Sequence, residues 1–289
     1  MTRFLRRLDP APLLLSLPAG LILGLFLLLP LLATALLSFR SYSLYTGIEP
    51  VLELGNYLEI FGDGYFLEIF LRTARIAALA TLLTILIGAP EAIILMRMRA
   101  PWRGLFLLVA LGPLLISVVS RTLGWALLLG STGVVNTALM AAGLIAEPIR
   151  FMYTEWGVTV ALAHVLLPFM IISVMTVLQR LDPQVENASH ALGAGGVTTF
   201  RRVILPQLLP GIFAGSIIVF AMAASAFATP QIIGGRRLKV VATLIYDEYL
   251  FSLNWPLGAA LALLLFAIVI VVAVGFNRLA ESRFARMYG

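Results

Sequence analysis

The sequence predicts an all-α integral membrane protein that crosses the bilayer six times. The chain has 289 residues, of which 61% are hydrophobic and 12% are charged, and its mean hydropathy is +1.02. A soluble domain carries about 25% charged residues, so this composition excludes a soluble enzyme and a disordered chain. Several stretches without Asp, Glu, Lys or Arg are long enough to cross a bilayer as helices and too uninterrupted for barrel strands.

The predicted spans follow these apolar stretches in order. The first is expected to be an uncleaved helix, because its apolar run from Leu13 to Leu32 exceeds the core of a signal peptide. Gly130 to Gly133 interrupt a further apolar stretch, which is expected to form a short outer-face helix over 134–145. The six spans, within a single domain covering 1–289, are 13–37, 72–96, 105–129, 157–179, 208–231 and 256–277.

The basic residues set the expected orientation. Loops on the cytoplasmic side of a membrane carry an excess of Lys and Arg. With the N-terminus inside, the inner segments hold most of the 20 Lys and Arg residues of the chain. An even number of spans then places both termini in the cytoplasm.

Several kinds of chemistry are not expected of this chain. It has no cysteine, which excludes disulfides and thiolate metal sites, and its two histidines lie far apart in the sequence. No G-x-x-x-x-G-K-[ST] motif occurs, so the chain is not expected to hydrolyse ATP. The basic residues are dispersed between apolar runs, which argues against nucleic-acid binding. We therefore expect no catalytic, cofactor-binding or metal-binding residue.

One inner loop, residues 181–206, carries the signals of ordered structure. Asp182 can cap a helix that begins at Pro183, and Gly193 can end it. Thr198 or Thr199 is expected to begin a second short helix that ends near 205–206. The loop is either an amphipathic helix lying at the interface or a docking element for a cytosolic partner.

The spacing within this loop resembles the EAA loop of binding-protein-dependent ABC importer permeases. Counting back from Gly193, the Glu position of that motif holds Asn187, with Glu186 one residue earlier. Further matches to the spermidine/putrescine permease branch include Arg121 with Trp125 and the segment 227–230. By this resemblance, the residues expected to couple the loop to an ATPase are Glu186, Asn187, Ala188, Ser189, His190, Gly193, Val203, Leu205 and Pro206.

The resemblance implies the fold and partners of a type I ABC importer permease in a bacterial inner membrane. In such a transporter two permease subunits, here expected to be different relatives, share the pathway within the lipid. A cytosolic ATPase dimer binds ATP and Mg, and a periplasmic binding protein delivers the solute. The implied solute is small and polar, with polyamines leading and opines, phosphonates or other charged metabolites as alternatives. A stand-alone secondary transporter is the rival class, but no inverted repeat or coupling-ion site is evident.

Some residues of the predicted spans are candidates for the pathway or a gate. Glu91 is charged within a span, and such a residue either lines a wet path or has a structural partner. Arg121 and His164 have the alternative roles of interface anchor and packing residue. The full set of candidates is Glu91, Arg121, Trp125, His164, Phe227, Pro230 and Gln231.

Overall fold

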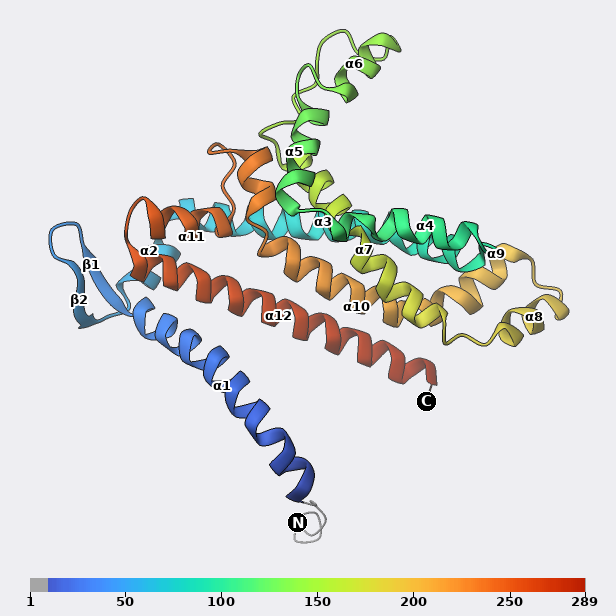
Figure 1. The fold of residues 1–289 in the computed structure, drawn as a ribbon, viewed down its shortest axis with the longest axis horizontal. Helices are drawn as coiled ribbons and strands as arrows, with labels where there is room; N and C mark the ends of the chain where they lie inside the picture. The colour runs from blue at the N-terminus through green and yellow to red at the C-terminus, as the bar shows by residue number, and fades with distance from the viewer. Residues whose placement is uncertain (1–9, 289) are drawn as a thin grey trace.

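The chain forms an elongated bundle of helices (Figure 1). The structure, a computed structural model, describes residues 10–288. In this part of the chain, six helices are long and apolar enough to cross a membrane, which confirms the number of spans predicted from the sequence.

The core of the bundle is built from three helices that pack against one another: α3 (Gly64–Arg97), α7 (Glu155–Leu178) and α10 (Leu205–Ala224). A fourth, α12 (Trp255–Tyr288), lies along α10 (Figure 1). These four helices correspond to the second, fourth, fifth and sixth predicted spans.

Glycines bring the core helices close together. A Cβ atom added at Gly88 of α3 would lie 3.1 Å from the Cγ of Met170 on α7. One added at Gly211 of α10 would lie 2.9 Å from the backbone oxygen of Ser173, also on α7. Close backbone approach is how helices gain packing energy in lipid, where no hydrophobic force drives them together.

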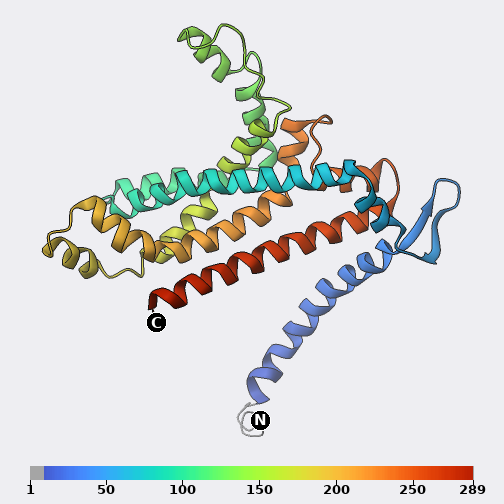
Figure 2. The same ribbon diagram turned by 180° about the vertical axis from the view of Figure 1, so that it is seen from behind.

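The first span, α1 (Pro10–Ser38), stands away from the bundle (Figures 1 and 2). The C-terminal end of α1 lies near the start of α12, and the two helices are farther apart toward the N-terminus of α1. Its most apolar stretch is unburied within the chain, and Phe26, for example, is 75% exposed. The side chains of α1 therefore face lipid or another protein.

The third predicted span, 105–129, is wrong as a single helix. The chain forms α4 (Trp102–Leu111) and a 3-10 turn η2 (Gly112–Leu115), and only then α5 (Val118–Leu129). Pro113 cannot donate a backbone hydrogen bond, and Ile116 has an extended backbone with ψ of 139°, so the helix breaks there.

After the break, α5 and α6 (Val134–Ala141) project away from the bundle as an arm (Figure 1). The short helix predicted after the glycines is thus confirmed as α6. The third segment apolar enough to span a membrane is Val118–Ala141, which combines α5 and α6.

Opposite ends of the bundle carry different short elements. The α2 end carries the hairpin of β1 (Arg40–Ser43) and β2 (Gly47–Leu52), together with α2 (Gly55–Gly62) and α11 (Val241–Leu250) (Figure 1). The hairpin was not predicted, because it consists of two short strands within an otherwise helical chain. The α8 end carries α8 (Pro183–Ala191), α9 (Gly196–Thr199) and a π-helical turn η3 (Phe200–Ile204).

Candidate functional site

Helix α8 forms as its sequence predicts. The Oδ1 of Asp182 accepts a hydrogen bond from the backbone N–H of Gln184 at 2.9 Å, and Pro183 occupies the first turn. At the other end Gly193 has a φ of +82°, which residues other than glycine rarely adopt. The N–H of Gly193 donates to His190 and that of Ala194 donates to Ser189, which is the Schellman arrangement. Both ends of α8 are therefore fixed locally.

The second short helix of the loop differs from the prediction. Gly195, and not a threonine, precedes α9, and α9 continues through η3 directly into α10. Leu205 and Pro206 therefore begin the core helix α10 and do not end a separate one. Val203 lies in η3, where its carbonyl accepts from the Nε2 of Gln207 at 2.9 Å. The only non-helical residues between α8 and α10 are therefore those that join α8 to α9.

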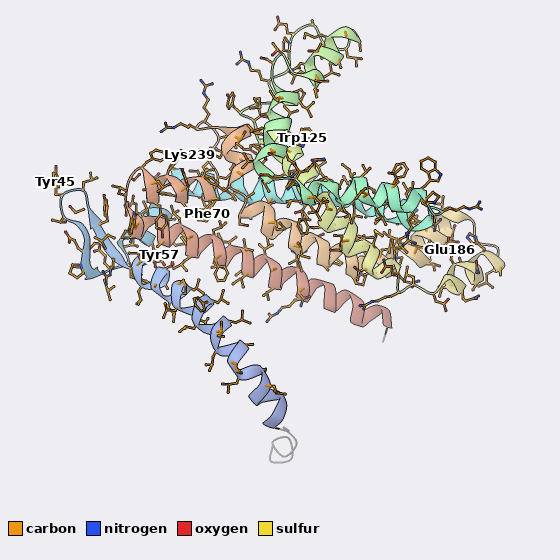
Figure 3. All side chains as sticks on the ribbon, viewed as in Figure 1. Tyr45, Tyr57, Phe70, Trp125, Glu186 and Lys239 are labelled. Atoms are coloured by element: carbon orange, nitrogen blue, oxygen red, sulfur yellow. The ribbon has the colours of Figure 1, made fainter. Side chains whose placement is uncertain are left out.

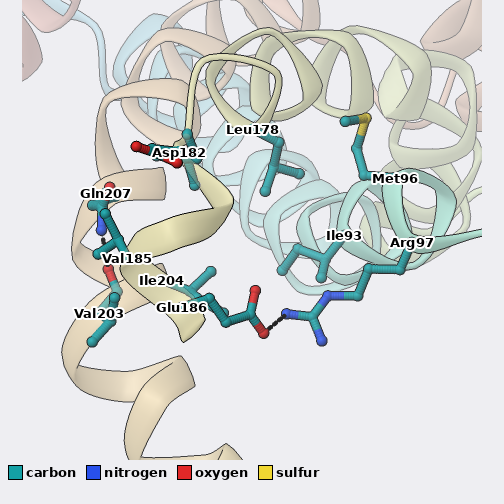
Figure 4. A pocket seen from close by; sticks show the side chains of 11 residues that line it. Ile93, Met96, Arg97, Leu178, Asp182, Val185, Glu186, Val203, Ile204 and Gln207 are labelled. Atoms are coloured by element: carbon teal, nitrogen blue, oxygen red, sulfur yellow. Dashed lines mark hydrogen bonds and ion pairs between the residues drawn. The ribbon is translucent and has the colours of Figure 1, made fainter. Parts of the chain in front are cut away.

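The side chains of α8 point in different directions. Glu186 is half-buried, and its Oε1 accepts a hydrogen bond from the Nη2 of Arg97 at the end of α3, at 2.9 Å (Figure 4). Ser189 lies 3.0 Å from the hydroxyl of Thr199 and joins α8 to α9. By contrast, the exposed residues here include Asn187, Ala188, His190, Ala191 and Leu192.

Apolar side chains are exposed at the tip of this loop. Leu192 is 89% exposed and Val197 is 75% exposed, on either side of the turn that joins α8 to α9. Large exposed apolar side chains next to an ordered backbone are typical of a surface that a partner covers. The arrangement can seat a protein partner against α8.

A cavity of about 210 Å³ lies between α8 and the ends of the core helices (Figure 4). Aliphatic side chains of α3 and α7 form part of its wall, and the Arg97–Glu186 pair crosses its edge. Its lining residues are Ile93, Met96, Arg97, Leu178, Leu181, Asp182, Val185, Glu186, Val203, Ile204 and Gln207.

A second group of candidates lies between α5 and α7, far from α8 (Figure 3). The indole N–H of Trp125 donates to the Nδ1 of His164 at 3.1 Å, and the two rings meet edge to face. The N–H of the neutral imidazole therefore lies on Nε2. One turn before Trp125, the Nε and Nη1 atoms of Arg121 are buried without a hydrogen-bond partner within the described residues.

The fifth predicted span is interrupted at the candidates Phe227, Pro230 and Gln231. Helix α10 ends at Ala224, and a π-helical turn η4 (Pro230–Gly234) follows after a short break. The ring of Phe227 in the break packs against Tyr246 of α11, with the centroids 4.8 Å apart. Discontinuous helices of this kind free backbone groups for solutes in many transporters.

Thr122 of α5 and Thr229 are both buried, and their hydroxyls lie 3.1 Å apart. This contact joins the base of the arm to the segment that follows the break in α10. The candidates of α5 and those of the α10 break therefore belong to one connected region.

Glu91 lies apart from these residues, in α3, and is partly buried. No ion pair of the described chain involves it, so the structural partner considered in the sequence analysis is not found there. Pro90, its neighbour, lies inside α3 and has no N–H to give to the helix.

Sequence reasoning missed the ion pairs of the α2 end. Glu155 at the start of α7 lies 3.6 Å from the Nε of Arg72 and 3.2 Å from the Nη1 of Arg75, both on α3. Arg72 also pairs with Glu68 one turn away, a spacing that the sequence does show. Glu68 and Glu155 therefore offset the charges of Arg72 and Arg75. Arg121 forms no ion pair among the described residues.

Near these pairs, the Nζ of Lys239 lies 2.7 Å from the Oδ2 of Asp247 on α11. Burial lowers the pKa of Lys239, but the hydrogen bond to Asp247 and nearby acidic groups outweigh it, so its pKa is raised overall. The neighbouring Glu248 has its pKa raised chiefly by burial. Within the described residues, no three His, Asp or Glu side chains gather as ligands for a metal ion.

Comparison with known proteins assigns the family. The family described as "Binding-protein-dependent transport system inner membrane component" matches residues 108–286, which include α8 and the break in α10. The chain belongs to this family. It is therefore a multi-pass inner membrane permease of an ABC importer, and the family predicted from the loop is confirmed.

Relatives of this permease cover nearly its whole length. The spermidine/putrescine transport system permease protein PotB of Haemophilus influenzae is 32% identical over 263 residues, which are 89% of this chain and 91% of that protein. PotB of Escherichia coli is 31% identical and covers 92% of this chain and 94% of its own. The putative 2-aminoethylphosphonate transport system permease protein PhnU of Salmonella paratyphi A is 28% identical, with coverages of 90% and 91%.

Solved structures share the fold of this permease. A chain of a bacterial ABC transporter that imports the acidic polysaccharide alginate matches with a TM-score of 0.78 at 18% identity, covering 95% of this chain and 96% of that one. A chain of the MetNI methionine ABC transporter matches with a TM-score of 0.56 at 17% identity, covering 73% and 92%. The predicted fold class is confirmed, apart from the hairpin and the broken third span.

Proposed function

We propose that this permease forms half of the translocation pathway of an ATP-driven importer for a polyamine-type solute. A second, related permease supplies the other half, and a periplasmic binding protein delivers the solute. A cytosolic ATPase dimer, which binds ATP and Mg, docks on α8. The present chain holds no cofactor and contributes no catalytic residue.

The shape of α8 is the observation that carries this proposal. Its N-terminus is capped by Asp182 and its C-terminus is closed by Gly193, so both ends of this short helix are fixed by its own loop. It exposes Asn187 and Leu192 at one extreme of the molecule. A stiff, exposed helix with an apolar tip can bind in a groove of a partner protein and be displaced when that partner moves.

The proposed orientation places the α8 end in the cytoplasm. The positive-inside rule supports it, because arginines are frequent in the segments of that end. The hairpin and α11 then face the periplasm, and both termini lie in the cytoplasm. The arginines of the α8 end are Arg97, Arg99, Arg103, Arg180, Arg201 and Arg202.

Polyamine-type solutes are supported by the names of the relatives and by the α2 end of the bundle. Polyamines are flexible polycations, which carboxylates and aromatic faces bind well. Glu248 is partly buried there, with the aromatic rings of Tyr246 and Tyr249 on the same helix. Arg72 and Arg75 do not oppose a cation, because Glu68 and Glu155 offset their charges.

A solute with an anionic group, such as an aminoalkylphosphonate or an opine, is the second candidate. Arg121 favours it, since two of its guanidinium nitrogens lack a partner in the described chain. A phosphonate or carboxylate accepts two parallel hydrogen bonds from such a group.

The test is uptake by proteoliposomes that contain both permeases, the ATPase and the binding protein. Labelled spermidine, putrescine and 2-aminoethylphosphonate are offered in turn, with ATP inside or outside the vesicles. We expect polyamine uptake that requires ATP on the α8 side. ATP-independent uptake by this chain alone would contradict the importer, and uptake of the phosphonate without the polyamines would favour the second candidate.

A variant separates the two solute classes further. Arg121→Gln keeps hydrogen-bonding ability but removes the charge. Its expected effect on polyamine uptake is small. A loss of phosphonate uptake of about tenfold or more is expected if an anionic group binds there, since hydrogen bonds to charged groups contribute about 1.5–3 kcal/mol.

A further inference from the structure

Glu186 faces the interior of the protein and not the surface that α8 offers to a partner. It lies in the first turn of α8, and its carboxylate accepts from Arg97 at 2.9 Å (Figure 4). Successive residues of a helix point about 100° apart, so the following residue, Asn187, is turned outward and is exposed. The two polar side chains therefore serve different neighbours.

The chain itself connects α8 to two of the three core helices. A short segment, 179–182, joins it to α7, and α9 with η3 joins it to α10. Helix α3 has no such connection, because it lies far earlier in the sequence. A displacement of α8 thus passes along the backbone to α7 and α10, whereas it reaches α3 directly only through side-chain contacts.

Direct packing between α8 and the end of α3 is incomplete. The cavity of about 210 Å³ separates part of α8 from the end of α3, with Ile93 and Met96 on one side and Val185 on the other. Across this gap Arg97 and Glu186 form an ion pair. Among the ion pairs of the described residues, this is the one that joins α8 to a core helix.

Both partners of the pair stand on firm helical backbone. Arg97 is the last residue of α3, and Glu186 is held in a helix capped at both ends. The side chains are 57% and 38% exposed, and ion pairs at such exposure add little to stability. What the pair provides is a direct link between α3 and α8, which no other ion pair or hydrogen bond of the described residues makes.

We propose that the Arg97–Glu186 pair is a strut that transmits the displacement of α8 to α3, so that all three core helices move together. Both residues are positioning residues for transport. The inference rests on the proposed function, because a partner ATPase must move α8. It separates the roles of neighbouring residues: Asn187 meets the partner, and Glu186 passes the motion on.

The first test measures the number of solute molecules imported per ATP hydrolysed by the complete complex. Glu186→Gln removes one charge with almost no change in shape, and Arg97→Gln removes the other charge and shortens the side chain. We expect assembly and ATP hydrolysis to persist, while the transport ratio falls at least about fivefold, the lower end of typical coupling between sites. Arg99→Gln, two residues beyond Arg97 and exposed, is the matched control and should keep the ratio of the unaltered complex.

The double variant Arg97→Glu with Glu186→Arg restores the pair with its charges exchanged. It should recover at least half of the lost ratio, which a merely structural role of either residue would not produce. Unchanged ratios in the single variants, or no recovery in the exchange, would overturn the strut. They would leave the importer standing as long as the unaltered complex transports. If that complex shows no ATP-driven uptake, the proposed function fails and the strut with it.

A cross-link tests whether the two helices stay together during transport. The chain has no cysteine, so a pair introduced as Arg97→Cys and Glu186→Cys reacts without competition within it. Bridging them with a short bifunctional reagent should leave uptake within about twofold of the unbridged complex. Abolished uptake would show that the pair must separate, and would overturn the strut.

Discussion

The indole Nε1–H of Trp125 donates a hydrogen bond to the Nδ1 of His164 over 3.1 Å and so joins α5 to α7. The arm formed by α5 and α6 has few other supports, since its apolar segment is only 17% buried within the chain. This hydrogen bond and the Thr122–Thr229 contact therefore decide where the arm leaves the bundle.

Trp125→Phe should destabilise the isolated permease. Most of the apolar ring is kept, but the hydrogen bond to the Nδ1 of His164 is lost, and an ordinary hydrogen bond contributes about 0.5–1.5 kcal/mol to stability. We expect the melting temperature in detergent to fall by several degrees. Trp156→Phe is the control, because Trp156 is 61% exposed, and it should change the melting temperature little. Equal melting of both variants would contradict a structural role for the bond.

Gly193→Ala should impair transport without removing the protein from the membrane. At a φ of +82° a Cβ atom costs about 1–2 kcal/mol, so the C-terminal turn of α8 opens and the helix loses its fixed end. The expected result is uptake reduced several-fold at unchanged membrane abundance.

The matched control for that variant is Gly195→Ala. Gly195 has a φ of −70°, and an added Cβ would meet no atom within 4 Å. Uptake by this variant should equal that of the unaltered permease. A similar loss in both variants would mean that the turn at Gly193 has no special role.

Gly211→Val should destabilise the core, because the added atoms would overlap α7. A Cβ atom alone would lie 2.9 Å from the Cγ2 of Val177, and overpacking of this kind costs about 1–3 kcal/mol. The same change at Gly20, where nothing lies within 4 Å, should leave the isolated chain unaffected. Thermal unfolding of both variants in detergent checks the contrast.

Glu248→Gln should stabilise the permease at neutral pH. Burial, the largest cause, raises the pKa of Glu248 in the folded protein, which means that folding disfavours its charged form. The resulting destabilisation is absent below about pH 4, where the carboxyl is protonated in both states, and it grows as the pH rises through the folded-state pKa. The melting temperature of the variant should therefore exceed that of the unaltered chain at pH 7.5.

The difference should vanish as the pH is lowered to about 4. Glu53→Gln, at an exposed position of the same end, is the control and should show no such trend. Glu248 also has a side-chain hydrogen bond with Ser252. A stabilisation that is independent of pH would assign the effect of Glu248→Gln to this hydrogen bond and not to charge.

The sequence allowed prediction where the rules are local. Asp182, Pro183 and Gly193 define α8 by capping chemistry that acts within a few residues, and the structure has the helix at those positions. The long apolar runs similarly predicted most spans, since length and composition decide whether a helix can cross lipid.

Features that depend on tertiary contacts were not predictable from the same rules. Two glycine pairs with identical spacing illustrate this: Gly211 and Gly215 pack against α7, whereas Gly20 and Gly24 contact nothing within the chain. The side-chain direction of Glu186 likewise depends on the position of α3 beside α8, which the sequence does not show. The break at Ile116 arises from one proline within an apolar run that otherwise reads as continuous.

The exposed flank of α1 has a consequence for biogenesis. Most of its leucines among residues 15–38 are exposed within the chain, so lipid tails or a neighbouring protein must surround them from the moment of insertion. A copy of the permease without its partner subunits keeps this apolar helix exposed and becomes a target for the proteases that degrade unassembled membrane proteins. Because this one helix is exposed, the permease and its partner subunits need to be synthesised in matched amounts.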